Sequence, residues 1–160
     1  MIAMKIIDSI LLSTILIAIL SCTVTTAFTE NRITYSIKFV CMPPLGPDNE
    51  AEFVSQPYKT VINIQNPNLN QTAYVEKKAV IAQSEDKDRG LISANVTDSL
   101  RSNEALSINC NDISSLFNST MPIGDGFVIL KSNLKLGVSA VYTTQGSIDV
   151  EYIQPFQPRM

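Results

Sequence analysis

The stretch that decides the fold is "TVINIQNPNLNQTAYVEKKAVIA", residues Thr60 to Ala82. It contains two runs rich in β-branched residues, separated by the asparagine-rich break "QNPNLNQ". Pro67 cannot donate a backbone hydrogen bond, and a residue that precedes a proline favours an extended conformation. Asparagines bond to their own backbone and tolerate left-handed geometry. We therefore interpret the break as a hairpin corner between two strands rather than as a ligand-binding loop.

The rest of the chain also has the pattern of β-strands. "ITYSIKFV" alternates apolar and polar residues, which is typical of a strand with one buried face. "GFVILKS", "LKLGVSAVYTT" and "SIDVEYIQP" are separated by short turns and predict an antiparallel meander. A short helix, "NDISSLF", is predicted after Cys110, with Asn111 or Asp112 as its N-cap. The sequence thus predicts an all-β fold, an immunoglobulin-like two-sheet antiparallel β-sandwich that forms one domain over residues 28–160.

Residues 1–27 have the features of an export segment. A weakly basic start is followed by an apolar run from Ile10 to Leu20 and by small residues that end at Ala27. We interpret this segment as a signal peptide, or as an N-terminal membrane anchor helix if it stays uncleaved, and a lipidated Cys22 is a third interpretation. All three predict an extracytoplasmic location, either secreted or membrane-anchored at the cell surface. Contact with the membrane is expected only through this segment, if it is uncleaved.

Two cysteines, Cys41 and Cys110, lie in the body of the chain, each at the end of an apolar run that resembles a strand. In an oxidising compartment an even pair most simply forms a disulfide, here between neighbouring strands or sheets. The alternative is a pair of buried free thiols. Three glycosylation sequons, at Asn70, Asn95 and Asn118, agree with an exported glycoprotein if these asparagines are exposed.

Composition excludes several functions. The chain has no histidine, which removes the commonest general base and metal ligand, and no tryptophan. Its 12 Lys and Arg residues are spread out, so no nucleic-acid partner is expected. We predict no cofactor, no metal and no catalytic site. The competing hypothesis is a carboxylate-dependent extracellular hydrolase that uses Asp149 and Glu151, which project from the same side of a strand. We expect this pair to lie on a solvated outer face instead.

Three stretches together carry a resemblance: "KFVC", "TVINIQNPN" and "LGVSAVYTT…SIDVEYIQP". In this combination the chain resembles an uncharacterised family of small exported β-sandwich proteins of bacteria and archaea. A glycine commonly follows the cysteine in that family, whereas Met42 follows it here. The resemblance covers most of the mature chain and implies the fold and the export, but no activity.

The predicted function is therefore that of a non-enzymatic extracytoplasmic β-sandwich, a structural or protein-binding component of the cell envelope. Its expected partner is another envelope or extracellular protein, bound through edge strands or through apolar loop residues such as Leu45, Phe53 and Met121. An anchored accessory subunit of a membrane complex is the alternative.

Overall fold

The computed structural model describes residues 32–42, 57–119 and 124–156. Strands dominate this part of the chain, and a short helix interrupts them. The elements, in chain order, are β1 (Ile33–Cys41), β2 (Lys59–Gln65), β3 (Ala73–Ile81), β4 (Val96–Leu100), β5 (Ala105–Asn109), α2 (Cys110–Leu116), β6 (Gly124–Ser132), β7 (Gly137–Thr144) and β8 (Ser147–Tyr152).

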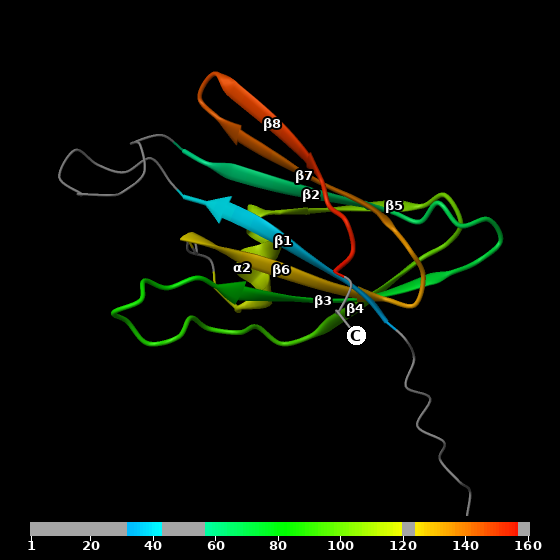
Figure 1. Cartoon of the computed structure of the whole chain (residues 1–160), viewed down its shortest axis with the longest axis horizontal. Helices are drawn as coiled ribbons and strands as arrows, with labels where there is room; N and C mark the ends of the chain where they lie inside the picture. Colours follow the sequence, from blue (N-terminus) through cyan, green and yellow to red (C-terminus); the bar gives the residue numbers. More distant parts are fainter. Residues whose placement is uncertain (1–31, 43–56, 120–123, 157–160) are drawn as a thin grey trace, which may run out of the picture. The chain divides into compact units, whose positions relative to one another are not determined.

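The strands form two four-stranded sheets, in the orders β1-β6-β3-β4 and β5-β2-β7-β8 (Figure 1). Every pairing within them is antiparallel. The predicted two-sheet antiparallel β-sandwich is therefore confirmed. The immunoglobulin-like subclass stays a prediction, because β2 pairs with β5 and β7, whereas the second strand of a constant-type immunoglobulin sandwich pairs with the first and fifth.

The core lies between the two sheets and is built by period-two alternation. On β1, Tyr35, Ile37 and Phe39 are fully buried, while the residues between them are more exposed. From the other sheet, Ile62 and Ile64 of β2 are fully buried in the same core. The remaining buried apolar residues of the strands and helix are Cys41, Ala73, Val75, Ala79, Leu100, Ile108, Ile113, Val128, Leu130, Val138 and Ala140.

The corner after β2 is not the hairpin that the sequence predicts, because β2 and β3 belong to different sheets. The break carries the chain across the sandwich from one sheet to the other. The predicted meander is wrong in the same way: β7 and β8 form a hairpin, but β6 lies in the opposite sheet. In both cases the two strands bury apolar residues in the same core, which is favourable whether or not they share backbone hydrogen bonds.

The interpretation of the break as a corner is supported by its hydrogen bonds. Asn66 is fully buried. Its amide nitrogen donates to the carbonyls of Gln71 (2.8 Å) and Leu100 (2.9 Å), and its side-chain oxygen accepts from the backbone N–H of Asn68 (3.1 Å). Asn70 adopts the left-handed conformation, with φ of 57°. A buried amide needs such partners to offset the hydration that it loses on folding. The hydrogen bonds of Asn66 connect β2, the corner and β4, so its role is structural.

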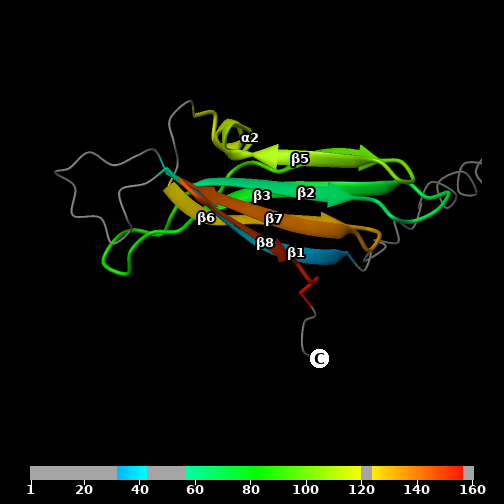
Figure 2. The ribbon, with the colours of Figure 1, turned by 90° about the horizontal axis from the view of Figure 1, so that it is seen from above.

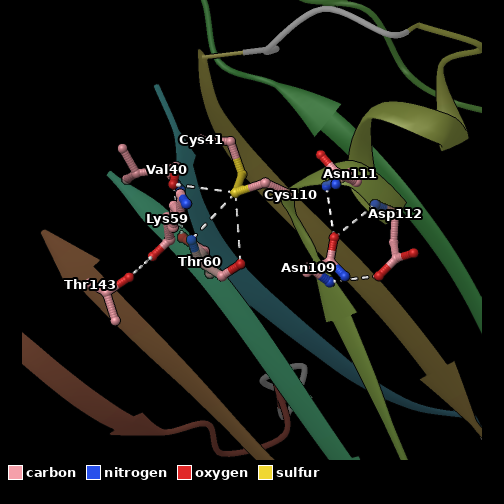
Figure 3. The surroundings of a disulfide bond; sticks show 9 residues. All are labelled: Val40, Cys41, Lys59, Thr60, Asn109, Cys110, Asn111, Asp112 and Thr143. Atoms are coloured by element: carbon pink, nitrogen blue, oxygen red, sulfur yellow. Dashed lines mark hydrogen bonds between the residues drawn. A yellow bond between two sulfur atoms is a disulfide. The ribbon is translucent and has the colours of Figure 1, made fainter. Parts of the chain in front are cut away.

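The predicted disulfide is present: Cys41 and Cys110 are bonded, with their Cα atoms 5.6 Å apart (Figure 3). Cys41 ends β1 and Cys110 follows β5, so the bond joins the two sheets. Beside it, the buried Thr60 of β2 bonds to both backbone groups of Val40, accepting from its N–H (2.8 Å) and donating to its carbonyl oxygen (3.1 Å). The covalent and hydrogen-bonded links together fix this end of the sandwich.

The predicted helix after Cys110 is confirmed, but its N-cap is Asn109, not Asn111 or Asp112. The Asn109 side chain accepts from the backbone N–H groups of Asn111 and Asp112, and the Asp112 carboxylate accepts from the N–H of Asn109. This is a capping box, which satisfies N–H groups that the first turn leaves unpaired. It starts α2 directly at Cys110 and so orients the cysteine toward β1.

Candidate binding surface

The register of the β7–β8 hairpin determines which side chains of β8 point toward the opposite sheet and which point outward. Its turn has two residues, so Thr144 pairs with Ser147, and the register runs on without interruption. Asp149 therefore lies opposite Tyr142, and Glu151 lies opposite Ala140. Ala140 is fully buried, and directly paired residues share a face of the sheet.

This register contradicts the expected placement of the two carboxylates. Asp149 and Glu151 do share one side of β8, but it is the side that faces toward the opposite sheet, not the outer face. They are nevertheless exposed, as is every residue of β8, because β8 is the last strand of its sheet (Figure 2). The outer face of β8 carries Ile148, Val150 and Tyr152 instead.

These three residues form an exposed apolar row. Ile148 is 73% exposed, Val150 is 50% exposed and Tyr152 is 79% exposed. Val150 pairs with Val141 of β7, which in turn pairs with Val61 of β2, so the row continues onto the sheet through two half-buried valines. We call Ile148, Val150, Tyr152, Val141 and Val61 together the β8 surface.

The sheet face around the β8 surface is almost free of charge. Among the described strand residues that point outward from this sheet, the one charged side chain is Lys59, at the end of β2. The others are Ala105, Ser107, Asn109, Asn63, Gln65, Gly137, Ser139 and Thr143, besides the β8 surface itself. A face with exposed apolar residues and few charges resembles the core of a protein–protein interface.

The outer face of the other sheet has a different character. There Arg32 forms an ion pair with Glu76 (2.7 Å), and Lys38 forms one with Asp125 (2.6 Å). Lys38 also lies over the ring of Phe127, 5.7 Å from its centroid. Charged side chains thus cover apolar surface on that sheet, as is usual for a solvated face. The β8 surface has no comparable cover within the described residues.

Tyr142 lies opposite Asp149 and packs against the core. Its hydroxyl donates to the backbone carbonyl of Lys38 (3.0 Å), and Glu151 lies 3.4 Å from the same hydroxyl. Partial burial, and after it the negative charges of Glu151 and Asp149, raise the pKa of Tyr142 to about 12. The phenol therefore keeps its proton at neutral pH and serves as a hydrogen-bond donor to β1.

The other predicted site residues are dispersed over the molecule. Asn70, Asn95 and Asn118 are all exposed, as glycosylation requires, but they lie on three separate segments. The predicted contact residues Leu45, Phe53 and Met121 lie outside the described residues. In the part of the chain that the structure describes, no group of three or more cysteine or acidic side chains could hold a metal ion. Over the same residues, no helix is long and apolar enough to cross a membrane.

Comparisons with known proteins add little. No family model matches the chain, and no curated protein matches it. Among solved structures, the chain is similar to the Anabaena sensory rhodopsin transducer, with a TM-score of 0.41 and 19% sequence identity over 71% of this chain and 95% of that one. A similarity at this level supports no conclusion about fold or function.

The β8 surface could have been found in the sequence by counting the register. The face that carries Ala140 and Tyr142 is recognisably the buried one, and the turn between β7 and β8 has two residues. Pairing outward from that turn places Asp149 on the buried side and Val150 on the outer side. Alternation within β8 alone favours the opposite assignment, since apolar residues normally point inward.

Proposed function

We propose that this chain is a non-enzymatic extracytoplasmic binding module, which binds another envelope or extracellular protein through the β8 surface. The observation that carries the proposal is the row of three exposed apolar side chains at the margin of an almost uncharged sheet face. Full burial of one large apolar side chain stabilises a complex by roughly 1.5–3 kcal/mol. Covering the row is thus a substantial driving force for association.

The location rests on two observations. The disulfide between Cys41 and Cys110 requires an oxidising environment to form and persist. The exposed Asn70, Asn95 and Asn118 are accessible to a glycosylating host. Together with the export segment predicted for residues 1–27, they support a secreted protein or one anchored at the cell surface.

The experiment is a comparison of native size in the host. The full chain and two lysine variants are extracted from the envelope and the medium in mild detergent and sized by native electrophoresis. Val150→Lys places a charge at the centre of the β8 surface. Ser107→Lys places the same charge on the same sheet face but on β5, three strands away and so roughly 14 Å distant.

We expect the wild-type chain and the Ser107→Lys control to migrate in an assembly larger than the monomer, and the Val150→Lys variant to migrate as the monomer. The proposal is wrong if the wild-type chain is monomeric in both fractions, or if the Val150→Lys variant keeps the assembly. Mass spectrometry of the same samples determines whether residues 1–27 are retained, which distinguishes an anchored subunit from a secreted module.

A further inference from the structure

Among the described residues, β8 has no strand paired to it on the side away from β7. In an antiparallel pair, alternate residues direct their N–H and C=O groups to the partner strand, and the residues between them direct these groups away. The N–H of Ile153 donates to the carbonyl of Val138 (2.9 Å), in continuation of the β7–β8 register. By the same alternation Asp149 and Glu151 also bond toward β7. The backbone groups of Ile148, Val150 and Tyr152 therefore point to the free edge.

No described strand covers this edge. The sheet order ends at β8, and in Figure 1 β8 lies at the margin of its sheet. After Tyr152 the chain leaves the sheet and crosses to the other one, where Phe156 bridges to Thr34 of β1 with its N–H 2.7 Å from the Thr34 carbonyl oxygen. The described residues that follow β8 thus pair with β1 instead, and none of the described residues forms a strand along the free edge of β8.

The two sides of the β8 edge differ sharply in chemistry. Ile148, Val150 and Tyr152 present apolar side chains on the outer side. Asp149 and Glu151 present carboxylates on the other side, and within the described residues neither forms an ion pair with a basic group. A strand added at this edge would place its own side chains directly opposite these two sets.

We propose that the edge of β8 binds an extended segment of the partner protein, in which apolar residues alternate with Lys or Arg. This inference deepens the proposed function and rests on it. The pattern apolar–basic–apolar–basic–apolar sets the apolar residues of the segment against Ile148, Val150 and Tyr152 and the basic residues against Glu151 and Asp149. The pattern is the same in both chain directions, so it fits parallel and antiparallel addition alike.

A second copy of this chain fits the edge less well. If two β8 strands pair with their apolar sides together, in a register centred on Asp149, Val150 or Glu151, acidic side chains of the two copies face each other. Directly opposed like charges destabilise a strand pair. The carboxylates therefore select for a cationic segment and against both self-pairing and acidic strands.

The test uses the full chain in mild detergent and fluorescently labelled heptapeptides, titrated at low ionic strength. The first peptide is acetyl-TVKVKVT-amide. The second carries Glu in place of Lys, and the third is the first with N-methyl groups on its three valines and two lysines, because the N–H groups that face β8 belong to the valines in antiparallel addition and to the lysines in parallel addition. N-methylation removes the N–H groups that would bond to the β8 edge but keeps the charge and the side chains. It thus isolates strand addition from simple electrostatic attraction.

Two variants make the complementary change in the protein. Val150→Pro removes the one N–H of Val150, which points to the free edge, so the hydrogen bonds between β7 and β8 are unaffected. Val150→Thr loses the same apolar side chain but keeps the N–H, and is the matched control. Circular dichroism verifies that both variants are folded.

We expect the lysine peptide to bind, the glutamate peptide not to bind, and N-methylation to weaken binding at least about tenfold, since it removes the hydrogen bonds of the added strand. Val150→Pro should weaken binding about tenfold more than Val150→Thr. The double variant Asp149→Asn/Glu151→Gln should weaken it about three- to tenfold, the effect of two cross-strand charge pairs.

The proposal is overturned if the lysine peptide does not bind at millimolar concentration, if the N-methylated or glutamate peptide binds as tightly, or if Val150→Pro and Val150→Thr behave alike. A wild-type dimer that Val150→Pro abolishes also overturns it, because the occupant is then a second copy. If the peptide fails but Val150→Lys still disrupts the native assembly, strand addition is wrong and the binding function stands. If both fail, the β8 surface is not a binding site.

Discussion

The buried Asn66 allows a sharp test of the interpretation of the asparagine-rich break as a structural corner. Replacing it with alanine leaves the carbonyls of Gln71 and Leu100, and the backbone N–H of Asn68, without their present partners. An unsatisfied buried group costs about 1–3 kcal/mol, and the loss of a partly exposed hydrogen bond costs roughly 0.5–1.5 kcal/mol. The bond to Leu100 is buried and the other two are partly buried, so we expect Asn66→Ala to lower the free energy of unfolding by about 2–6 kcal/mol.

Asn66→Asp sharpens the test because the two side chains have nearly the same shape. The aspartate keeps an oxygen that can accept from Asn68, but it replaces the amide donor by a second oxygen facing the carbonyls of Gln71 and Leu100. At neutral pH it also buries a charge with no basic partner. We therefore expect Asn66→Asp to be more destabilising than Asn66→Ala.

The matched control is Asn70→Asp, which makes the same chemical change four residues further along the corner. Asn70 is exposed and left-handed, a conformation that aspartate also tolerates, so its free energy of unfolding should change by less than about 0.5 kcal/mol. The assay is urea unfolding of the full chain followed by far-ultraviolet circular dichroism, since the chain has no tryptophan. If both Asn66 variants are as stable as Asn70→Asp, the corner does not depend on this side chain and the reasoning is refuted.

Three further predictions concern the rest of the sandwich. Replacing Cys41 and Cys110 by serine opens a link between residues 69 positions apart and should lower the free energy of unfolding by about 4 kcal/mol; an unchanged urea midpoint would contradict this. Because the pKa of Tyr142 is raised to about 12, the stability that its phenol contributes is fully present below pH 10 and is lost as the pH rises toward 12. Tyr142→Phe should therefore reduce the loss of unfolding free energy between pH 10 and pH 12. An equal loss in the wild-type chain and the variant would refute this. Gly126→Ala should lower the free energy of unfolding by about 1–3 kcal/mol, because the added Cβ would collide with a backbone carbonyl oxygen of β3. Gly137→Ala is the control, since its Cβ would meet nothing closer than 3.9 Å. Equal melting temperatures of the two variants would refute the difference.

The parts of the fold that were predictable are those that follow from local alternation. The apolar positions of β1 and of β2 are the ones that the structure buries, and the two-residue turn before Ser147 produces a hairpin. The disulfide was predictable for a related reason, since Cys41 and Cys110 each follow a run with a buried face. These features depend on residues that are close together in the chain.

The pairing of strands was not predictable in the same way. The break around Asn66 has the composition of a turn, and that composition is equally compatible with a hairpin and with a crossing between sheets. What distinguishes them is the partner of Asn66 on β4, the carbonyl of Leu100, which is 34 residues away. The side chains on β8 were misassigned because alternation defines two faces but not which one is buried.

The sequence by itself determined that this protein is an antiparallel sandwich closed by a disulfide, because period-two alternation and paired cysteines act through short-range geometry. Only the tertiary structure decided which strands share a sheet, and that β8 is the last strand of its own. An apolar residue is buried only where another layer covers it. Nothing covers β8 within the described residues, so Ile148, Val150 and Tyr152 remain exposed, and the margin of the sandwich becomes its candidate binding surface.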